Sequence, residues 1–340
     1  MKAFFDPRQR AHAPPQTLVN GAFDNNPEVP ERIDHLMAGA KAAGATFARP
    51  EDRGLAPIAA IHTPEYLDFL QHIHTRWRRI KGASEAVIPA VHPLTRTAAY
   101  PQSAAAQAGW HMADGSCPID AQTWDAAYWS AQTALAAADC VAAGAPIAYA
   151  LSRPPGHHAF ADAAAGFCYL NNTAIAAEHL RTRGHRPAIL DLDVHHGNGT
   201  QAIFNHRADI LTVSLHADPA RFYPFFWGHP QERGTGAGLG ANLNLPLPKG
   251  ANDATFQAAL KTALRRIKTF SPTILVVALG LDAHIDDPFK GLAVTTEGFA
   301  TIGATLHQTG LPLVLVQEGG YVGGALGQNL TSVLTGAMGR

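Results

Sequence analysis

The segment A-I-L-D-L-D-V-H-H-G-N-G-T at residues 188–200 joins a short apolar run to a cluster of chemically active side chains. The run at 188–194 is too short for a helix and rich in leucine and β-branched residues, which is typical of a strand buried on both faces. In an extended chain, Asp191, Asp193 and His195 share one face. We therefore predict a buried strand that delivers two carboxylates and an imidazole to its carboxyl end.

Similar apolar runs recur along the second half of the chain, at 147–151, 210–215, 274–279 and 313–316. Segments long enough for helices separate several of them, at 173–183, 253–269 and 296–308. Strands that alternate with helices predict a parallel sheet, and ligands of such sheets gather beyond the carboxyl ends of the strands. We expect an α/β fold, with helices on both faces of the sheet and the active site at the strand ends.

The first half is less regular. Helices are expected at 30–43, 64–79 and 123–144, whereas 82–118 mixes Pro, Gly, Ser and Ala without periodicity and is expected to be loop. No linker composition, charge block or repeat divides the chain. We predict one catalytic domain over residues 1–340, with an insert at about 84–122.

Composition excludes several classes of protein. Of the 340 residues 46% are hydrophobic and 16% charged, so the chain is not intrinsically disordered. A formal net charge of −1 gives no basic excess, and we expect neither a nucleic-acid nor a membrane partner. Three cysteines without a CxxC pair and an N-terminus without an apolar segment favour a cytoplasmic protein with reduced thiols.

The ends of the predicted strands carry the candidate chemistry. Two buried carboxylates repel each other unless a cation lies between them. Asp193 and His195, joined by Asp282 from the strand at 274–279, would give three protein ligands and an open position, as in a catalytic zinc site. Asp191 is left to support this site or to bind another cation. The alternative is a set of solvated carboxylates at a loop edge.

Two further strand ends supply candidate acid–base groups. His157 and His158 follow Pro-Pro-Gly, a stiff turn that would hold a general base at a fixed position. Tyr321 follows two glycines, and its phenol could stabilise an oxyanion. Each residue taken alone would be more simply explained as a packing or surface side chain, so the hypothesis depends on their common location.

Five motifs together resemble the histone deacetylase-like amidohydrolases, and the length and insert are most similar to the bacterial acetylpolyamine amidohydrolases of that family. They cover about half the chain, as R-P-P-G-H-H at 153–158, G-F-C-Y-L-N-N at 166–172, D-L-D-V-H-H-G-N-G-T at 191–200, G-L-D at 280–282 and E-G-G-Y at 318–321. The resemblance implies an arginase/deacetylase-type α/β fold and one Zn²⁺ held by Asp193, His195 and Asp282.

The resemblance also implies catalytic roles. His158 would be the general base and then the acid, His157 its electrostatic partner, and Tyr321 the donor to the oxyanion. Asp191 would orient His157. Asn198 stands at the position that orients His158, where many nuclear members have aspartate, and a neutral partner should make His158 less basic.

Further sites follow from the same resemblance. A structural K⁺ is implied near Asp191, Asp193, His195, Ser214 and Leu215. Substrate contacts are implied at Gly166, whose carbonyl would accept the amide N–H, at the tunnel walls Phe167 and Tyr223, and at Asp114 for a remote ammonium group. The insert is similar to a dimerisation element, so a homodimer is expected.

The expected reaction removes the acetyl group from acetylated polyamines or small diamines, such as acetylputrescine, acetylcadaverine or acetylspermidine, to give acetate and the free amine. Residues 101–110 contain no acid, which leaves room for short acetyldiamines. Fe²⁺ or Co²⁺ could replace zinc in this ligand set. The alternatives are a deacetylase of acetyl-lysine or other small acylamines, a binuclear ureohydrolase, and a non-catalytic sensor of acylamines.

Overall fold

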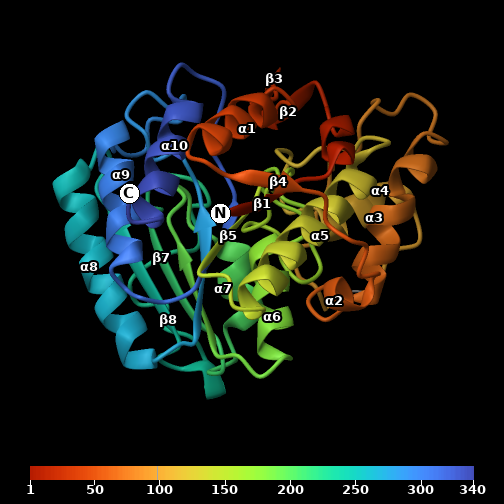
Figure 1. Cartoon of the computed structure of the whole chain (residues 1–340). Helices are drawn as coiled ribbons and strands as arrows, with labels where there is room; N and C mark the ends of the chain where they lie inside the picture. Colours follow the sequence, from red (N-terminus) through yellow and green to blue (C-terminus); the bar gives the residue numbers. More distant parts are fainter. Residues whose placement is uncertain (98) are drawn as a thin grey trace.

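A parallel sheet of eight strands forms the centre of the computed structural model, which describes residues 1–97 and 99–340 (Figure 1). The strand order is β4-β1-β5-β10-β9-β6-β7-β8. The strands are β1 (Lys2–Phe4), β4 (Thr46–Ala48), β5 (Ile147–Ala150), β6 (Pro187–Asp191), β7 (Leu211–Ala217), β8 (Asn242–Leu247), β9 (Ile274–Leu279) and β10 (Leu313–Gln317). A separate antiparallel hairpin consists of β2 (Gln16–Val19) and β3 (Ala22–Asn25).

Helices cover both faces of the sheet, as Figure 1 shows for α8 and α9 on one side and α5 and α6 on the other. One layer contains α1 (Arg32–Ala42), α8 (Asp253–Phe270), α9 (Thr296–His307) and α10 (Leu326–Ala337). The other contains α3 (Pro64–Trp77), α4 (Ala104–His111), α5 (Thr123–Ala142) and α6 (Asn172–Arg181). The short helices are α2 (Ala56–Ala59), α7 (Asn198–Phe204) and the 3₁₀ turns η1 (Pro7–Ala11) and η2 (Gly236–Gly238).

Successive strand residues enter two different cores. In β9, Leu275 and Val277 pack with the α8 layer, whereas Val276 between them packs with the α5 layer. All six residues of this strand are buried, which explains its continuous apolar run. The predicted α/β architecture with helices on both faces is confirmed.

Two predicted segments differ in the structure. The strand expected at 188–194 ends at Asp191, because carboxylates capture the next backbone N–H groups: Asp193 N donates to Asp191 Oδ1 (3.1 Å) and His195 N to Asp193 Oδ1 (2.9 Å). The segment expected to be loop at 82–118 contains α4, whose N-cap Ser103 accepts from Ala106 N. The short strands β1, β4 and β8 and the helices α7 and α10 were not predicted.

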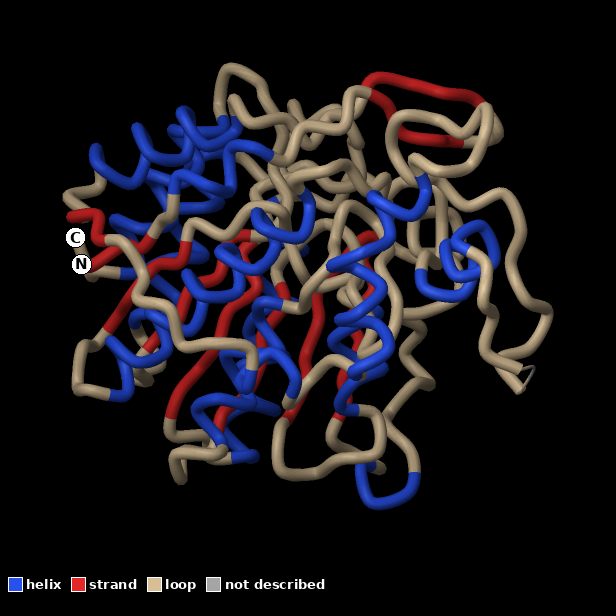
Figure 2. The backbone as a smooth tube through the Cα atoms, turned by 90° about the vertical axis from the view of Figure 1, so that its right-hand side faces the viewer, coloured by secondary structure: helices blue, strands red, loops and turns tan. Residues whose placement is uncertain are grey.

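Long loops gather at one end of the strands, together with the β2–β3 hairpin (Figure 2). Leu18 and Val19 of this hairpin line the same cavity as His158 and Tyr321. The carboxyl ends of the strands therefore share one hollow with the hairpin. Within the described residues, no helix has the length and apolar character needed to cross a membrane.

Candidate active site

Asp193, His195 and Asp282 converge at the carboxyl ends of the adjacent strands β6 and β9. Each offers one ligand atom, and these atoms lie within 4.8 Å of one another in a buried group. Asp282 Oδ1 accepts from Val194 N (3.0 Å), but its Oδ2 is buried and has no hydrogen-bond partner among the residues that the structure describes. A buried carboxylate oxygen without a partner is costly unless a cation binds it. The group therefore fits a metal ion.

The surrounding backbone leaves space only for these ligand atoms. A Cβ on Gly280 would lie 2.3 Å from Asp193 Oδ2, and one on Gly319 would lie 2.0 Å from Asp282 Oδ2. His195 directs Nδ1 at both carboxylates, 3.1 Å from Asp193 Oδ1 and 3.5 Å from Asp282 Oδ2. Burial and the neighbouring charge of Asp193 raise the pKa of Asp282. Two carboxylates and one imidazole suit Zn²⁺, Fe²⁺ or Co²⁺.

A second buried group, His157, Cys168 and Glu318, also has closely spaced ligand atoms, but both oxygens of its carboxylate already accept hydrogen bonds. Glu318 Oε2 accepts from Gly156 N (2.6 Å) and His157 N (3.0 Å), and its Oε1 accepts from Thr173 Oγ1 (2.8 Å). Both carboxylate oxygens are thus used to hold the turn that carries the two histidines.

The rings of His157 and His158 lie close together, with centroids 4.0 Å apart and planes inclined by 44°, but they have different hydrogen-bond partners. His157 Nδ1 donates to Asp191 Oδ2 (2.9 Å), and His158 Nδ1 donates to Asn198 Oδ1 (2.7 Å). Burial opposes the charged form of His157, yet the Asp191 carboxylate raises its pKa to about 10. Burial and the adjacent His157 hold the pKa of His158 well below its ordinary value. His158 is therefore a neutral imidazole whose Nε2 carries a lone pair.

Tyr321 is buried at the same hollow, just beyond β10. Its ring packs against Phe289 (centroids 4.8 Å apart) and Phe167 (6.0 Å). Burial raises the pKa of Tyr321 well above its ordinary value, so the phenol stays protonated. No hydrogen bond among residues 1–97 and 99–340 engages its hydroxyl, which leaves the O–H available to a ligand.

The loop that carries Tyr321 is held by an arginine that the sequence motifs did not reveal. Arg32, from α1, donates through Nε to Gly320 O (2.5 Å) and through Nη2 to Glu318 O (2.7 Å). Its guanidinium also lies 5.2 Å from the centroid of the Tyr321 ring. Arg32 is fully buried with Glu28 as its ion-pair partner (2.5 Å). The i,i+4 spacing of this pair was visible in the sequence, but its contact with a loop almost 300 positions away was not.

A cavity of about 540 Å³ leads to these groups. Its wall includes the predicted substrate residues Gly166, Phe167 and Tyr223. Gly166 has φ +49°, and a Cβ there would lie 2.5 Å from His158 Cδ2. The Tyr223 ring meets the His158 ring edge-on at 4.9 Å. Aromatic walls on this scale suit a narrow acyl chain.

Asp114 also lines this cavity, but protein donors already occupy its carboxylate. Tyr223 donates its hydroxyl to Oδ2 (2.6 Å), and Ser116 donates both N (2.9 Å) and Oγ (2.6 Å) to Oδ1. Gly166 N adds a longer contact (3.3 Å). The structure thus shows Asp114 joining opposite walls of the cavity, while its contact with a substrate ammonium stays a prediction.

The structure shows where the residues of the predicted K⁺ site and of the insert lie, but it does not test their predicted roles. Asp191 and Ser214 are register partners in the β6–β7 ladder, with Leu215 next in the strand, so the groups expected around K⁺ lie together. The insert at about 84–122 is closed near its base by the Val87–Ile119 bridge. The K⁺ site, the insert as a dimerisation element and the single-domain boundary remain predictions.

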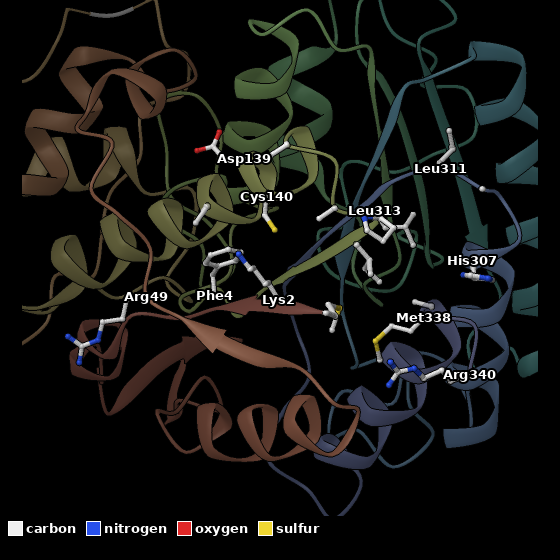
Figure 3. Close-up of a pocket in the computed structure, with 18 of the residues that line it drawn as sticks. Lys2, Phe4, Arg49, Asp139, Cys140, His307, Leu311, Leu313, Met338 and Arg340 are labelled. Carbon is white, nitrogen blue, oxygen red and sulfur yellow. The ribbon is translucent and has the colours of Figure 1, made fainter.

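A different cavity, of about 860 Å³, lies at the amino ends of β5 and β10 (Figure 3). Its lining includes Lys2, Arg49, Asp139, Cys140 and Arg340. Among the described residues, neither of the two groups with metal-ligand spacing contributes to it. Catalysis is therefore expected at the carboxyl end, where base, phenol and metal group meet.

Comparison with known proteins supports this location. Residues 26–337 match the model of the histone deacetylase domain, a family that is generally metal-dependent. The acetylpolyamine amidohydrolase of Burkholderia pseudomallei is 49% identical over 94% of each chain, and the histone deacetylase-like amidohydrolase of Pseudomonas aeruginosa is 40% identical over 72% of this chain and 66% of that one.

Solved structures agree. The crystal structure of an acetylpolyamine aminohydrolase from Burkholderia pseudomallei superposes with a TM-score of 0.95 at 48% identity, covering 99% of this chain and 98% of the other. The HD domain of HDA15 superposes with a TM-score of 0.81 at 27% identity, over 100% and 91%. The resemblance inferred from the motifs is confirmed: the chain is an enzyme and belongs to the histone deacetylase family.

Proposed function

We propose that this enzyme is a zinc-dependent amidohydrolase that removes the acetyl group from acetylated polyamines or small diamines, releasing acetate and the free amine. One observation carries the proposal: the ligand atoms of Asp193, His195 and Asp282 lie within 4.8 Å of one another, and Asp193 and His195 line the same cavity as His158 and Tyr321. A metal group, a base and a phenol around one narrow cavity are the parts that amide hydrolysis requires.

Each residue has a separate task in this reaction. When bound by Asp193, His195 and Asp282, zinc would polarise the amide carbonyl and acidify a water molecule. His158 Nε2 takes a proton from the attacking water, since its Nδ1–H is held by Asn198. The Tyr321 O–H donates to the oxygen on which negative charge develops. His158 then gives its proton to the nitrogen of the leaving amine.

The cavity supports an amine with a slender chain. Phe160, Phe167, Tyr223, Phe225 and Trp227 present aromatic faces along it, and such faces attract alkylammonium groups. Among the described lining residues, Asp114 is the acid remote from the metal group, and its oxygens accept from Tyr223 and Ser116. A substrate with one distal ammonium therefore matches the cavity better than a long polycation. Acetylputrescine and acetylcadaverine are the expected preferred substrates.

The test is an assay of the zinc-loaded protein on acetylputrescine, acetylcadaverine, acetylspermidine and an acetyl-lysine peptide in parallel. The highest kcat/KM is expected on the two acetyldiamines. Preference for the peptide would overturn the substrate class, and zinc-loaded protein without turnover of any acylamine would indicate a sensor. Metal analysis in the same samples should give about one divalent ion per chain, whereas two divalent ions would indicate the binuclear ureohydrolase.

A further inference from the structure

One wall of the catalytic cavity is a single loop segment, Arg221–Trp227, between β7 and β8. Phe222 stacks on the imidazole of His195, with centroids 5.0 Å apart and planes inclined by 17°. Tyr223 meets the ring of His158 at 4.9 Å. The position of this segment therefore sets the free space beside the metal group and the base.

One carboxylate oxygen, Oε2 of Glu232, holds the end of this segment in place. Glu232 Oε2 accepts from Gln201 Nε2 (2.6 Å), from Gly228 N (2.9 Å) and from Asn244 Nδ2 (3.3 Å). Gln201 belongs to α7 and Asn244 to β8, and each is only 2% exposed. A single half-buried atom thus joins the end of the wall segment to two rigid elements of the fold.

The donor groups are themselves fixed. Gln201 Oε1 accepts from Asn244 Nδ2 (2.8 Å) and Asn242 Nδ2 (2.9 Å), which leaves its Nε2 to point at Glu232. Asn242 also donates to the Glu232 carbonyl (2.7 Å). Within the described residues Gln201 Nε2 and Gly228 N have no other acceptor, so loss of the Glu232 carboxylate would leave these two donors unsatisfied, whereas Asn244 Nδ2 keeps Gln201 Oε1 and His229 O.

Gly228 is the point where the wall segment meets the body of the protein. Its φ is +106°, and a Cβ would lie 2.8 Å from both His196 Cγ and His216 Nε2. Its carbonyl accepts from His216 Nε2 (2.9 Å) while its N–H donates to Glu232. Both polar groups of this residue are therefore engaged, and the wall can shift only if these contacts open.

We propose that Glu232 is a positioning residue that holds the Arg221–Trp227 wall against the cavity and thereby sets the affinity for the acyl-amine chain; this rests on the deacetylase function proposed above. Glu232 touches none of the reacting groups, so its effect reaches the substrate through Phe222 and Tyr223. Its loss should weaken substrate binding and spare the chemical step, because Asp193, His158 and Tyr321 are held by other contacts.

A conservative variant gives the matched control. Glu232→Ala removes the acceptor, whereas Glu232→Gln can present its amide oxygen to the same donors, because the other carboxylate oxygen makes no hydrogen bond within the described residues. Gln201→Glu is an isosteric second variant that places a carboxylate opposite Glu232.

The first measurement needs no substrate. Arg221, the first residue of the wall segment, and Arg233, which follows the segment, are exposed. The rate of trypsin cleavage at these arginines therefore reports opening of the wall in the full-length, metal-loaded protein. Glu232→Ala and Gln201→Glu should be cut about tenfold faster at Arg221, which corresponds to about 1.4 kcal/mol of lost closure. Glu232→Gln should be cut at nearly the wild-type rate.

The second measurement is steady-state kinetics on acetylputrescine with metal content determined in parallel. Glu232→Ala should raise KM about tenfold with kcat within about threefold and unchanged metal, as expected for loss of a contact that acts equally before and during the reaction. Glu232→Gln should restore KM.

The outcomes separate this proposal from the proposed function. Equal tryptic rates and equal KM for Glu232→Ala and wild type overturn it, as does a loss confined to kcat. Equal damage in Glu232→Gln and Glu232→Ala also overturns it, since the acceptor oxygen is then not what matters. If Glu232→Ala does not fold, Gln201→Glu decides: a tryptic rate and a KM equal to those of wild type then overturn the proposal. If no acylamine is hydrolysed even by wild type, the proposed function fails, while the tryptic comparison still decides whether Glu232 holds the wall.

Discussion

Replacing Tyr321 with Phe removes one hydroxyl from the active site and little else. The ring is held by Phe289 and Phe167, and Arg32 lies 5.2 Å from its centroid. None of these contacts uses the phenolic oxygen. The free energy of unfolding should therefore change by less than about 0.5 kcal/mol. Any loss of activity then reports on the hydroxyl alone.

The expected size of the loss follows from the position of this hydroxyl. Tyr321 is 6% exposed, so bulk water cannot readily replace the missing donor. Loss of one donor to a developing oxyanion lowers kcat by about 10²–10³, which is about 2.7–4 kcal/mol. Because burial raises the pKa of Tyr321 well above its ordinary value, the deficit should be the same across the neutral pH range.

The assay compares kcat on acetylputrescine for Tyr321→Phe and for Tyr223→Phe at equal metal content. Tyr223 offers a matched control because it is a phenol in the same cavity whose hydroxyl donates to Asp114 (2.6 Å). Its replacement should lower kcat by less than about tenfold, since this hydroxyl donates to Asp114 and not to the oxygen on which charge develops. If Tyr321→Phe keeps more than about a tenth of the wild-type kcat, Tyr321 is not the oxyanion donor.

Other parts of the structure support independent predictions. Asp282→Asn should lose metal and activity together, because it removes a charge from the ligand group, and full metal content by elemental analysis would contradict the ligand assignment. Arg153→Ala should lower the free energy of unfolding by about 3–5 kcal/mol in a urea titration. It removes one of the two ion-pair partners of the buried Glu28 (2.9 Å) and the donor to the carbonyls of Gln9, His12 and Glu28. A loss below about 1 kcal/mol would show that these contacts contribute little. Burial opposes ionisation of Asp139, but its hydrogen bond to His179 lowers its pKa from 3.8 to about 2. This contribution to stability is complete above the unfolded pKa and is lost as the pH falls from about 4 to 2. Asp139→Asn should therefore make the thermal-unfolding Tm depend less on pH over this range. A pH dependence of Tm equal to that of wild type would refute this role of Asp139.

Much of the site could be predicted because parallel topology makes local motifs meet. The run at 188–194 supplies strand β6 as far as Asp191, and the run at 274–279 is strand β9. The two strands lie side by side, so Asp193 and Asp282 come together just beyond their ends. The same reasoning placed the histidine turn and Tyr321 beyond β5 and β10, which are also neighbours. Periodicity identifies the strands, and the topology brings their ends together.

The features of the site and fold that could not be predicted depend on contacts between distant segments, which no local sequence pattern indicates. Asp114 accepts from the Tyr223 hydroxyl, 109 positions away, and no local pattern indicates this hydrogen bond. Arg32 holds the loop of Tyr321 from a helix near the other end of the chain. Helix α4 was missed because an alanine-rich segment between prolines has little periodicity, and its buried face is decided by the packing of α3.

The two adjacent histidines show why such distant contacts decide function. His157 and His158 are the same residue type in the same rigid turn, so their sequence neighbourhood cannot make one charged and the other neutral. The difference comes from Asp191, an anion at the end of β6, and from Asn198, a neutral amide at the start of α7. The cation that forms on His157 in turn lowers the pKa of its neighbour. An acid–base pair therefore arises only when one strand end and one helix start are brought to the same turn, and the chemistry of this site is a property of the fold as much as of its motifs.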